Sequence, residues 1–277
     1  MKTSDAAAEI TRASKSNLAF AFVAISGARR RDITTFYAFC RIIDDIADDD
    51  RRDQETKRRE LAVWRQSLRG RFADEPALAR PVRQLIATYR ITPEMLEEII
   101  TGVEMDIDLR RYATWEELRV YCHRVASAVG LVSIEIFGYK NPQCRNYAIV
   151  LGLALQMTNI IRDVAVDLKA DRIYLPQEDL ARFDYPEENL RNGLTDMRFI
   201  QLMNFEAGRA GKFFAEATKL LPREDHRSML PAEIMRSIYQ ALLRRMKLDN
   251  FRMFEKDYRL SKIEKAGRAA AQLFKFF

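Results

Sequence analysis

Apolar residues recur along most of the chain at intervals of three and four, which is the spacing of amphipathic helices. No alternating apolar and polar run is long enough to predict a strand, and there is no internal repeat or low-complexity linker. The predicted helices cover approximately residues 8–26, 33–49, 54–70, 76–90, 93–110, 115–138, 142–167, 195–220, 228–254 and 259–275. The pattern also predicts an extended segment over 172–176 and a loop with short turns over 176–192. We therefore predict one all-α domain spanning residues 1–277.

Local signals refine several of these helices. Asp32 is expected to cap the helix that follows it. Thr114 with Glu117 three residues later predicts a capping box. The helix that begins there contains the small residues 126–128 and Gly130. Because glycine inside a helix costs up to about 1 kcal/mol relative to alanine, this segment indicates either close helix packing or space for a ligand.

Two acidic stretches about 115 residues apart interrupt apolar helical runs. The first stretch contains Asp44 and Asp48, and the second contains Asn159, Asp163 and Asp167. Their spacing of four residues places each set on one face of its helix. Asp45 falls beside the first stripe and is expected to lie behind the ligands or in solvent. We predict two stripes of oxygen ligands that face each other across a pocket.

The residue types in the two stripes indicate the chemistry. Carboxylates among isoleucine and valine are costly to bury unless a positive charge compensates them. Aspartate and asparagine oxygens without histidine favour a Mg²⁺ cluster over Zn²⁺ or a di-iron site. Mg²⁺ held by few carboxylates keeps positions for phosphate oxygens, and Arg41 and Arg162 lie next to the stripes. Each arginine could form a structural ion pair or contact a diphosphate. Together these features predict a diphosphate leaving group on a hydrophobic substrate.

Composition excludes several other classes of protein. With 48% apolar and 31% charged residues, the 277-residue chain is globular in composition. It has no βαβ pattern and no GxGxxG, so no dinucleotide-binding fold is expected, and no nucleic-acid partner is predicted. Cys40, Cys122 and Cys144 lack metal-site spacing, which favours buried free thiols in a reducing compartment. There is no secretory signal, and the longest apolar stretch, 148–157, is shorter than the roughly 20 residues of a membrane span. We expect a cytoplasmic protein.

The net charge of +6 is concentrated near the C-terminus. Residues 236–277 contain eleven basic and four acidic residues, a net charge of +7, so the remainder sums to −1. This basic region could attract anionic lipid or an anionic substrate, or form a solvated helix face. With the terminal segment 274–277, Phe-Lys-Phe-Phe, it favours loose peripheral contact with the inner face of a membrane.

Three motifs in this order resemble those of the squalene/phytoene synthase family. They are Tyr37-Ala38-Phe39-Cys40-Arg41-x-x-Asp44-Asp45-x-x-Asp48, Tyr121-Cys122-x-Arg124-Val125-Ala126-x-x-Val129-Gly130, and Asn159-x-x-Arg162-Asp163-x-x-x-Asp167, which Arg172-Ile173-Tyr174-Leu175-Pro176 follows. The resemblance covers approximately residues 14–261. A single acidic motif is unspecific, since other prenyl synthases and terpene cyclases carry one, but three motifs at this spacing are specific. The resemblance implies an all-α isoprenoid-synthase bundle with a central active-site cavity. It also implies head-to-head (1′–1) coupling of two allylic diphosphates.

The resemblance also implies roles for individual residues. It implies that the Mg²⁺ cluster is held by Asp44, Asp48, Asn159, Asp163 and Asp167. It implies that isoprenyl diphosphate substrates are bound by Ser14, Lys15, Ser16, Tyr37, Arg41, Tyr121, Gln156, Asn159, Arg162 and Tyr239. Direct catalytic roles fall to Tyr121, Arg162, Asp44 and Asp163, with Tyr121 near the point of proton transfer or cation stabilisation. NADPH use stays open, because family members that reduce their product do so without a Rossmann motif.

Three positions depart from the family pattern. Asn17 stands where an aromatic residue is common, which weakens the assignment of diphosphate contacts to residues 14–16. Val166 stands where many members have an acid, so the second stripe has less charge. His123 stands where many members have tyrosine or aspartate, and we interpret it as a packing or hydrogen-bonding residue more readily than as a catalytic one.

The sequence leaves the product undecided among related reactions. The segments 125–130 and 133–138 look closest to the bacterial hopanoid branch, which makes presqualene diphosphate or squalene from farnesyl diphosphate. The alternative within the family is a phytoene or dehydrosqualene synthase of carotenoid pathways. A terpene cyclase is disfavoured because its second motif has serine and glutamate where this chain has Asp163 and Asp167. A helical scaffold would have no need for two ligand stripes. We expect a monomer or a homodimer.

Overall fold

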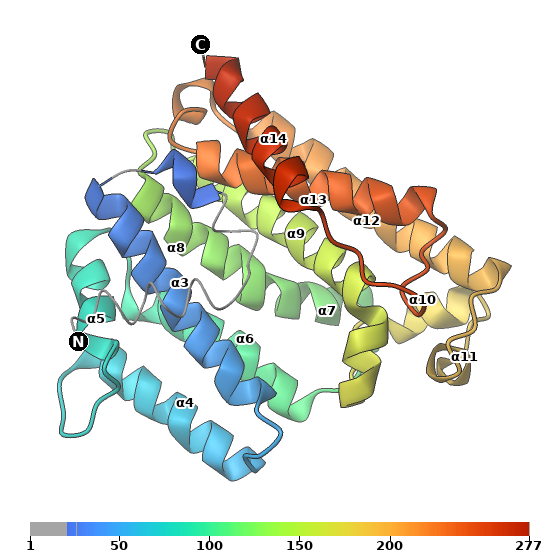
Figure 1. Cartoon of the computed structure of the whole chain (residues 1–277). Coiled ribbons are helices and arrows are strands. Elements are labelled where there is room, and N and C mark those ends of the chain that lie inside the picture. Colours follow the sequence, from blue (N-terminus) through green and yellow to red (C-terminus); the bar gives the residue numbers. More distant parts are fainter. Residues whose placement is uncertain (1–20, 26, 277) are drawn as a thin grey trace.

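The computed structural model describes residues 21–25 and 27–276, which form the helical bundle of Figure 1. Its α-helices are α3 (Gly27–Asp48), α4 (Gln54–Arg69), α5 (Ala79–Thr88), α6 (Pro93–Asp108), α7 (Trp115–Cys122), α8 (Ala128–Phe137), α9 (Cys144–Asp167), α10 (Gln177–Arg182), α11 (Glu187–Arg191), α12 (Met197–Leu220), α13 (Leu230–Leu248) and α14 (Lys262–Leu273). Short helical turns are η1 (Phe22–Ala24), η2 (His123–Ser127), η3 (Leu168–Ala170), η4 (Arg223–Asp225) and η5 (Phe274–Phe276). Within the described residues the β pairing is limited to one isolated bridge, Arg111 to Ile173. The predicted all-α fold is confirmed. Most of the helix predicted over 8–26 lies outside the described residues.

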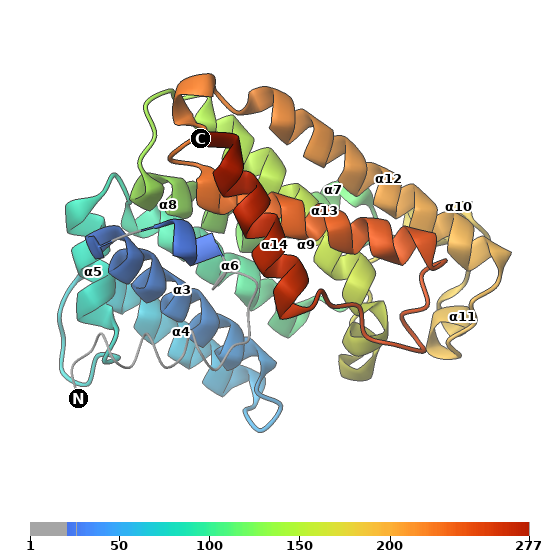
Figure 2. The same cartoon turned by 45° about the horizontal axis from the view of Figure 1, so that its top comes forward.

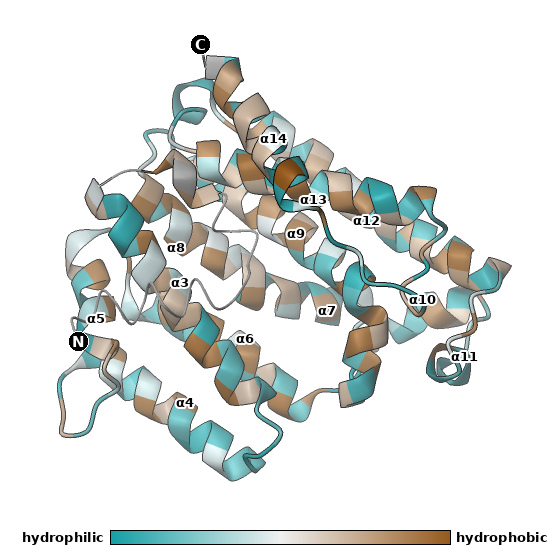
Figure 3. Ribbon diagram, in the orientation of Figure 1, coloured by the Kyte–Doolittle hydropathy of each residue, from teal (hydrophilic) through white to brown (hydrophobic). Residues whose placement is uncertain are grey.

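Helix α9 lies at the centre of the bundle. It packs against α8 and η2 on one side and against α12 and α13 on the other, while α14 lies on α13 (Figures 1 and 2). Helices α3, α4, α5 and α6 form the remaining part, in which α6 contacts α3, α4, α8 and η2. In Figure 3, α4 at the edge of the bundle shows mainly hydrophilic colours, whereas brown is frequent on α8 and α9. Residues of α3, α6, η2 and α9 together line a cavity.

Two helical stretches, Trp115–Phe137 and Cys144–Ala170, are long and apolar enough to cross a membrane by length and composition alone. Half of each apolar window is buried inside the bundle. Their partners in the bundle include each other, and α9 also packs on α12. Core helices are apolar for the same reason that membrane spans are, so internal packing accounts for their composition.

The prediction that Asp32 caps a helix is wrong. Helix α3 begins at Gly27, whose φ of +58° is a conformation that glycine adopts without a steric penalty. The three arginines before Asp32 are therefore helical, and Asp32 lies inside the helix. Its carboxylate accepts a hydrogen bond of 2.5 Å from the Tyr89 hydroxyl. The Asp32 side chain therefore makes a tertiary contact at the end of α5 and does not cap a helix.

The small-residue segment in the predicted helix 115–138 serves close packing. The helix is interrupted by the π-helical turn η2, where a side chain on Gly152 of α9 would lie 2.6 Å from the Ser127 Cα atom. Ser127 Oγ donates a 2.7 Å hydrogen bond to the Ile149 carbonyl. Gly130 similarly faces the Ala148 carbonyl, which a Cβ atom would approach to 3.0 Å. Two helices that approach this closely leave no room for side chains at the crossing.

Other local predictions are partly correct. Thr114 accepts a hydrogen bond from the Glu117 amide at 3.3 Å, as predicted. The Glu117 carboxylate, however, accepts from the amide of Ala113 and not of Thr114, so the capping box is shifted by one residue. The predicted loop over 176–192 contains the short helices α10 and α11. All three cysteines are buried and free, as expected.

Candidate active site

A cavity of about 300 Å³ lies between α3, α6, η2 and α9. We call it the acidic cavity, and it is lined by Arg41, Asp44, Asp48, Val103, Asp106, Tyr121, Val125, Gln156, Asn159, Ile160, Arg162, Asp163, Asp167, Arg172 and Tyr174. All five predicted metal ligands are in this lining, together with the predicted substrate residues Arg41, Tyr121, Gln156 and Arg162. The two stripes therefore face one cavity from different helices, although more than a hundred residues separate them in sequence.

Helix α3 supplies Asp44 and Asp48. The half-buried Asp44 has a pKa of about 7, raised chiefly by burial and then by the neighbouring charge of Asp48. Asp48 itself accepts a 2.8 Å hydrogen bond from Arg172 Nη1. Asp45 is exposed and pairs with Arg41 at 2.5 Å, as its position beside the stripe predicted. The α3 wall thus offers a half-buried carboxylate, Asp44, and an exposed one, Asp48, whose charges repel each other.

Helix α9 supplies Asn159, Asp163 and Asp167 from one face. Asp163 is paired with Arg162 through two hydrogen bonds of 2.8 and 2.5 Å. The pKa of Asp167 is raised to about 8, first by burial and next by Asp163. The Oδ1 atom of Asn159 is buried without a hydrogen-bond partner, while its Nδ2 atom donates to Gln156 at 3.3 Å. A buried amide oxygen without a donor has lost its bonds to water and gained none.

These observations fit a hard divalent cation. Positive charge would offset the burial and the like charges that raise the pKa of Asp44 and Asp167, and the Asn159 oxygen would gain a partner. Among the described residues, no three acidic, histidine or cysteine side chains converge into a metal site complete by itself. Mg²⁺ is commonly bound through one or two carboxylates plus water and substrate phosphates. The donor set is therefore suited to Mg²⁺ that arrives with a diphosphate.

Three polar residues of the acidic cavity were not among the predicted site residues: Asp106, Arg172 and Tyr174. Asp106 is buried and accepts hydrogen bonds from the hydroxyls of Tyr121, at 2.9 Å, and Tyr174, at 2.6 Å. Burial raises its pKa to about 6, although both tyrosine hydrogen bonds act in the opposite direction. The rings of Tyr121 and Tyr174 are stacked with centroids 5.1 Å apart. Asp106 therefore fixes the positions of two aromatic side chains in the cavity wall.

A sequence signal for Asp106 existed. It lies on the apolar stripe of α6 that includes Leu96, Ile99 and Val103, at the spacing of three and four residues that marks the buried face. A lone aspartate on such a face requires buried hydrogen-bond donors. The identity of those donors could not be predicted, because Tyr121 and Tyr174 lie 15 and 68 residues away.

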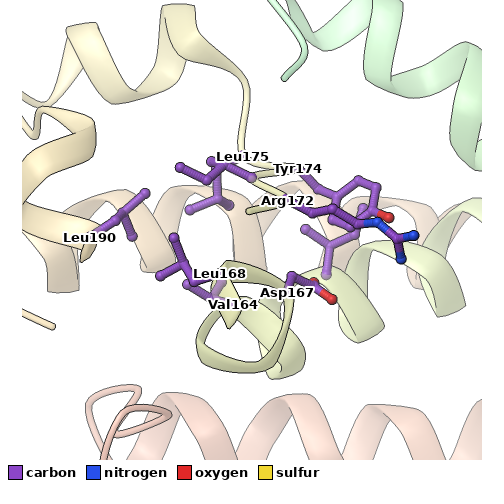
Figure 4. A pocket seen from close by; sticks show the side chains of 9 residues that line it. Val164, Asp167, Leu168, Arg172, Tyr174, Leu175 and Leu190 are labelled. Carbon is purple, nitrogen blue, oxygen red and sulfur yellow. The ribbon is translucent and has the colours of Figure 1, made fainter. Parts of the chain in front are cut away.

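Figure 4 shows how the end of α9 is held beside the cavity. The polar ends of Asp167, Arg172 and Tyr174 point to one side, away from Leu175 and Leu190. A void of only about 10 Å³ remains among the apolar side chains, so this corner is well packed. The packing gives Asp167, the last predicted ligand of the second stripe, a defined position.

A second cavity of about 600 Å³ adjoins the first and shares Arg41, Arg162 and Asp163 with it. We call it the basic cavity, and its other lining residues are Tyr37, Val166, Ile238, Tyr239, Leu242, Met253, Lys256, Asp257, Tyr258, Arg259, Leu260 and Lys265. The predicted substrate residues Tyr37 and Tyr239 lie here and not in the acidic cavity, with Tyr239 interacting with Arg162. The arrangement places a cationic, partly apolar chamber next to the acidic wall.

The remaining predictions concern residues 14–16, Val166 and His123. Ser14, Lys15 and Ser16 lie outside the described residues. Val166 is 54% exposed at the rim of the basic cavity. His123 lies in η2 and lines neither of these two cavities, and burial lowers its pKa, which favours the neutral ring. This agrees with its interpretation as a packing residue.

The chain matches known proteins along most of its length. Residues 11–264 match the squalene/phytoene synthase family. The chain is 34% identical over 243 residues to a 15-cis-phytoene synthase of Synechococcus elongatus, covering 83% of this chain and 79% of the relative. It is 32% identical over 247 residues to a presqualene diphosphate synthase of Zymomonas mobilis, covering 88% and 84%.

Solved structures agree with the sequence matches. A ligand-bound dehydrosqualene synthase superposes with a TM-score of 0.87 at 22% identity, covering 99% of this chain and 96% of that one. A squalene synthase from Alicyclobacillus acidocaldarius superposes with a TM-score of 0.80 at 26% identity, covering 90% and 94%. The fold described above is thus the fold of these synthases.

Proposed function

The chain belongs to the squalene/phytoene synthase family and is a prenyltransferase, and we propose that it couples two farnesyl diphosphates head to head to presqualene diphosphate. The observation that supports this proposal most strongly is the pair of stripes in one cavity, whose lining includes the partnerless Asn159 oxygen, three arginines and the acidic side chains. Such a site is suited to a metal-bound diphosphate and not to a neutral substrate.

In this proposal Asp44, Asp48, Asn159, Asp163 and Asp167 would hold Mg²⁺. When bound, Mg²⁺ supplies positive charge for the departing diphosphate. Arg41 and Arg162, which face both cavities, orient the diphosphate groups through charge-assisted hydrogen bonds. For Arg162 this requires a partial exchange of its bonds to Asp163.

The organic reaction needs an apolar, aromatic environment. The bond between C1 of one substrate and its diphosphate oxygen breaks, and the diphosphate leaves with the electron pair. The alkene of the second substrate attacks the resulting allylic cation, and loss of one proton closes a cyclopropane. The stacked rings of Tyr121 and Tyr174 can stabilise the cation, while Asp106 keeps the Tyr121 hydroxyl at a defined position in the cavity wall. Exclusion of water protects the cation from capture.

A second candidate is the coupling of two geranylgeranyl diphosphates to phytoene. It is favoured by the identity of 34–35% to the phytoene synthases of Synechococcus elongatus and a Synechocystis strain. The presqualene diphosphate candidate is favoured by the Zymomonas mobilis relative and by the segment 125–138, which resembles the hopanoid branch. Both candidates use the same acidic cavity. They differ in prenyl chain length and in whether the cyclopropyl diphosphate also loses its remaining diphosphate.

Product analysis separates the two candidates. The purified protein is incubated with Mg²⁺ and either farnesyl or geranylgeranyl diphosphate, with and without NADPH, and the products are identified by mass spectrometry. We expect a C30 diphosphate that contains a cyclopropane from farnesyl diphosphate alone. A C40 hydrocarbon from geranylgeranyl diphosphate would select phytoene synthesis, and NADPH-dependent conversion to squalene would extend the first reaction. A cyclised C15 or C20 product would contradict head-to-head coupling.

A further inference from the structure

We infer that the outward face of α14 is a docking surface for an anionic lipid membrane. Two large apolar side chains on this side are highly exposed, Ile263 of α14 at 85% and Phe274, which directly follows α14 as the first residue of η5, at 77%. Eleven residues separate them, which is about three turns, so they lie on the same side of the helix. Between them this face presents Ala266, Gly267 and Ala270, and a Cβ atom added to Gly267 would meet nothing within 4 Å. The result is an apolar stripe along the outside of the bundle.

The opposite face of α14 is already occupied. Ala269 is buried against the bundle, and Arg268 Nη1 donates to the Ser237 carbonyl of α13 at 3.2 Å. Arg245 of α13 forms an ion pair with Glu264 in the first turn of α14. Figure 2 shows α14 lying across α13 at the surface of the molecule. Because the inward face is fixed in this way, turning the apolar stripe inward would break these contacts.

The charged side chains beside the apolar stripe indicate which partner this face binds. The segment 262–275 contains four basic residues and one acidic residue, and Lys262 and Lys275 are exposed beside the stripe. Anionic headgroups attract such lysines, while Ile263 and Phe274 can enter the boundary of the acyl chains. A second copy of α14 would bring the same positive charges together, which disfavours a dimer through this face. The pattern of basic and apolar side chains therefore fits an anionic bilayer.

The docking surface is connected to the candidate active site, and this step rests on the proposed function. Residues 256–260, which lead into α14, and Lys265 in its first turn line the basic cavity. Ile263 and Lys265 are two residues apart and so point to nearly opposite sides of the helix. Docking through the stripe would thus place one wall of the cavity at the lipid surface.

Vesicle co-sedimentation tests the docking surface. The full chain is mixed at low salt with vesicles of phosphatidylcholine alone or with phosphatidylglycerol added. We expect binding to the anionic vesicles that weakens as salt is raised. The double variant Ile263→Ser/Phe274→Ser should bind at least about fivefold more weakly, since it loses both inserted side chains. Lys262→Gln/Lys275→Gln should lower binding and its salt dependence.

The matched control is Met197→Ser, which removes another exposed apolar side chain, 66% exposed at the start of α12. It should bind like the unchanged protein. Thermal unfolding and turnover without vesicles should be unchanged in the Ile263/Phe274 variant, so failed docking is distinguishable from failed catalysis. Absence of vesicle binding at low salt, or equal binding by the double variant, would overturn the inference. So would a dimer in sedimentation velocity that the double variant dissociates, because the face would then contact a second copy.

Discussion

Two groups of carboxylates lie near the end of α9 and have opposite electrostatic environments. In the acidic cavity, burial and like charges raise the pKa of Asp44 to about 7 and of Asp167 to about 8. Four residues after Asp167, outside the cavity, hydrogen bonds from Arg191 and Arg111 lower the pKa of Asp171. The surface network also includes Glu187, which pairs with both arginines and whose pKa is lowered too.

The difference separates a functional site from a structural one. Arginines compensate the surface network within the protein, so it needs no ligand. In the acidic cavity carboxylates remain in excess, and the buried Asn159 oxygen lacks a donor. Uncompensated groups of this kind cluster at functional sites. Changes to the cavity should therefore affect activity, and changes to the network should affect only stability.

The largest expected effect is on the metal stripes. Asp44→Ala and Asp163→Ala should lower turnover by at least about a hundredfold, because preorganised charge at a reacting group contributes about that much. Activity should require Mg²⁺ and disappear in EDTA. Asp45→Ala is the matched control, since Asp45 is adjacent in sequence but exposed, and it should keep most of the activity. Circular dichroism should show folded protein in each case, and full turnover in EDTA would contradict the metal assignment.

A smaller loss is expected from Asp106→Asn. The Tyr121 and Tyr174 hydroxyls would exchange a carboxylate acceptor for a neutral amide, and we expect a decrease in kcat of about tenfold to a hundredfold with little change in KM. Asp108→Asn, two residues on at an exposed ion pair with Arg58, is the control. The pH profile of kcat should change only in the Asp106 variant. If both variants gave the same kcat and profile, the assigned role of Asp106 would be wrong.

The next prediction concerns stability without metal. The pKa of Asp167 is about 8 in the folded state, against 3.8 for an unperturbed aspartate, so the folded protein binds more protons between these pH values. Stability of the metal-free protein should fall as pH rises through this window. Asp167→Asn removes the cost of ionising this carboxyl, so the variant should be more stable than the unchanged protein by about 1 kcal/mol at pH 9. This value is reduced because the group is only half-buried. Urea unfolding at pH 4 should give the same free energy of unfolding for the variant and the unchanged protein. A variant that is less stable than the unchanged protein at pH 9 would contradict the prediction.

The smallest effect is expected in the surface network. Glu187→Gln should lower the free energy of unfolding by about 0.5 kcal/mol at pH 7, as for other partly exposed ion pairs. Because its folded pKa lies below 4.5, this contribution is present above pH 4.5 and lost as pH falls through the folded pKa. Turnover should not change. The neighbouring exposed Glu188→Gln should leave stability unaltered, and a large activity loss in the Glu187 variant would remove the distinction between the two groups.

The sequence alone determined the two stripes, the helices that hold them and the family. Helical periodicity is a local property, so spacing of four residues was enough to place Asp44 with Asp48, and Asn159 with Asp163 and Asp167. Only the tertiary structure decided which distant groups meet. Asp32 accepts a hydrogen bond from the Tyr89 hydroxyl and does not cap a helix as predicted. Asp106 accepts hydrogen bonds from Tyr121 and Tyr174, so residues from three segments meet. The tertiary structure also assigned Tyr37 and Tyr239 to the adjoining basic cavity. Such contacts depend on how whole helices pack, which no short window of sequence contains.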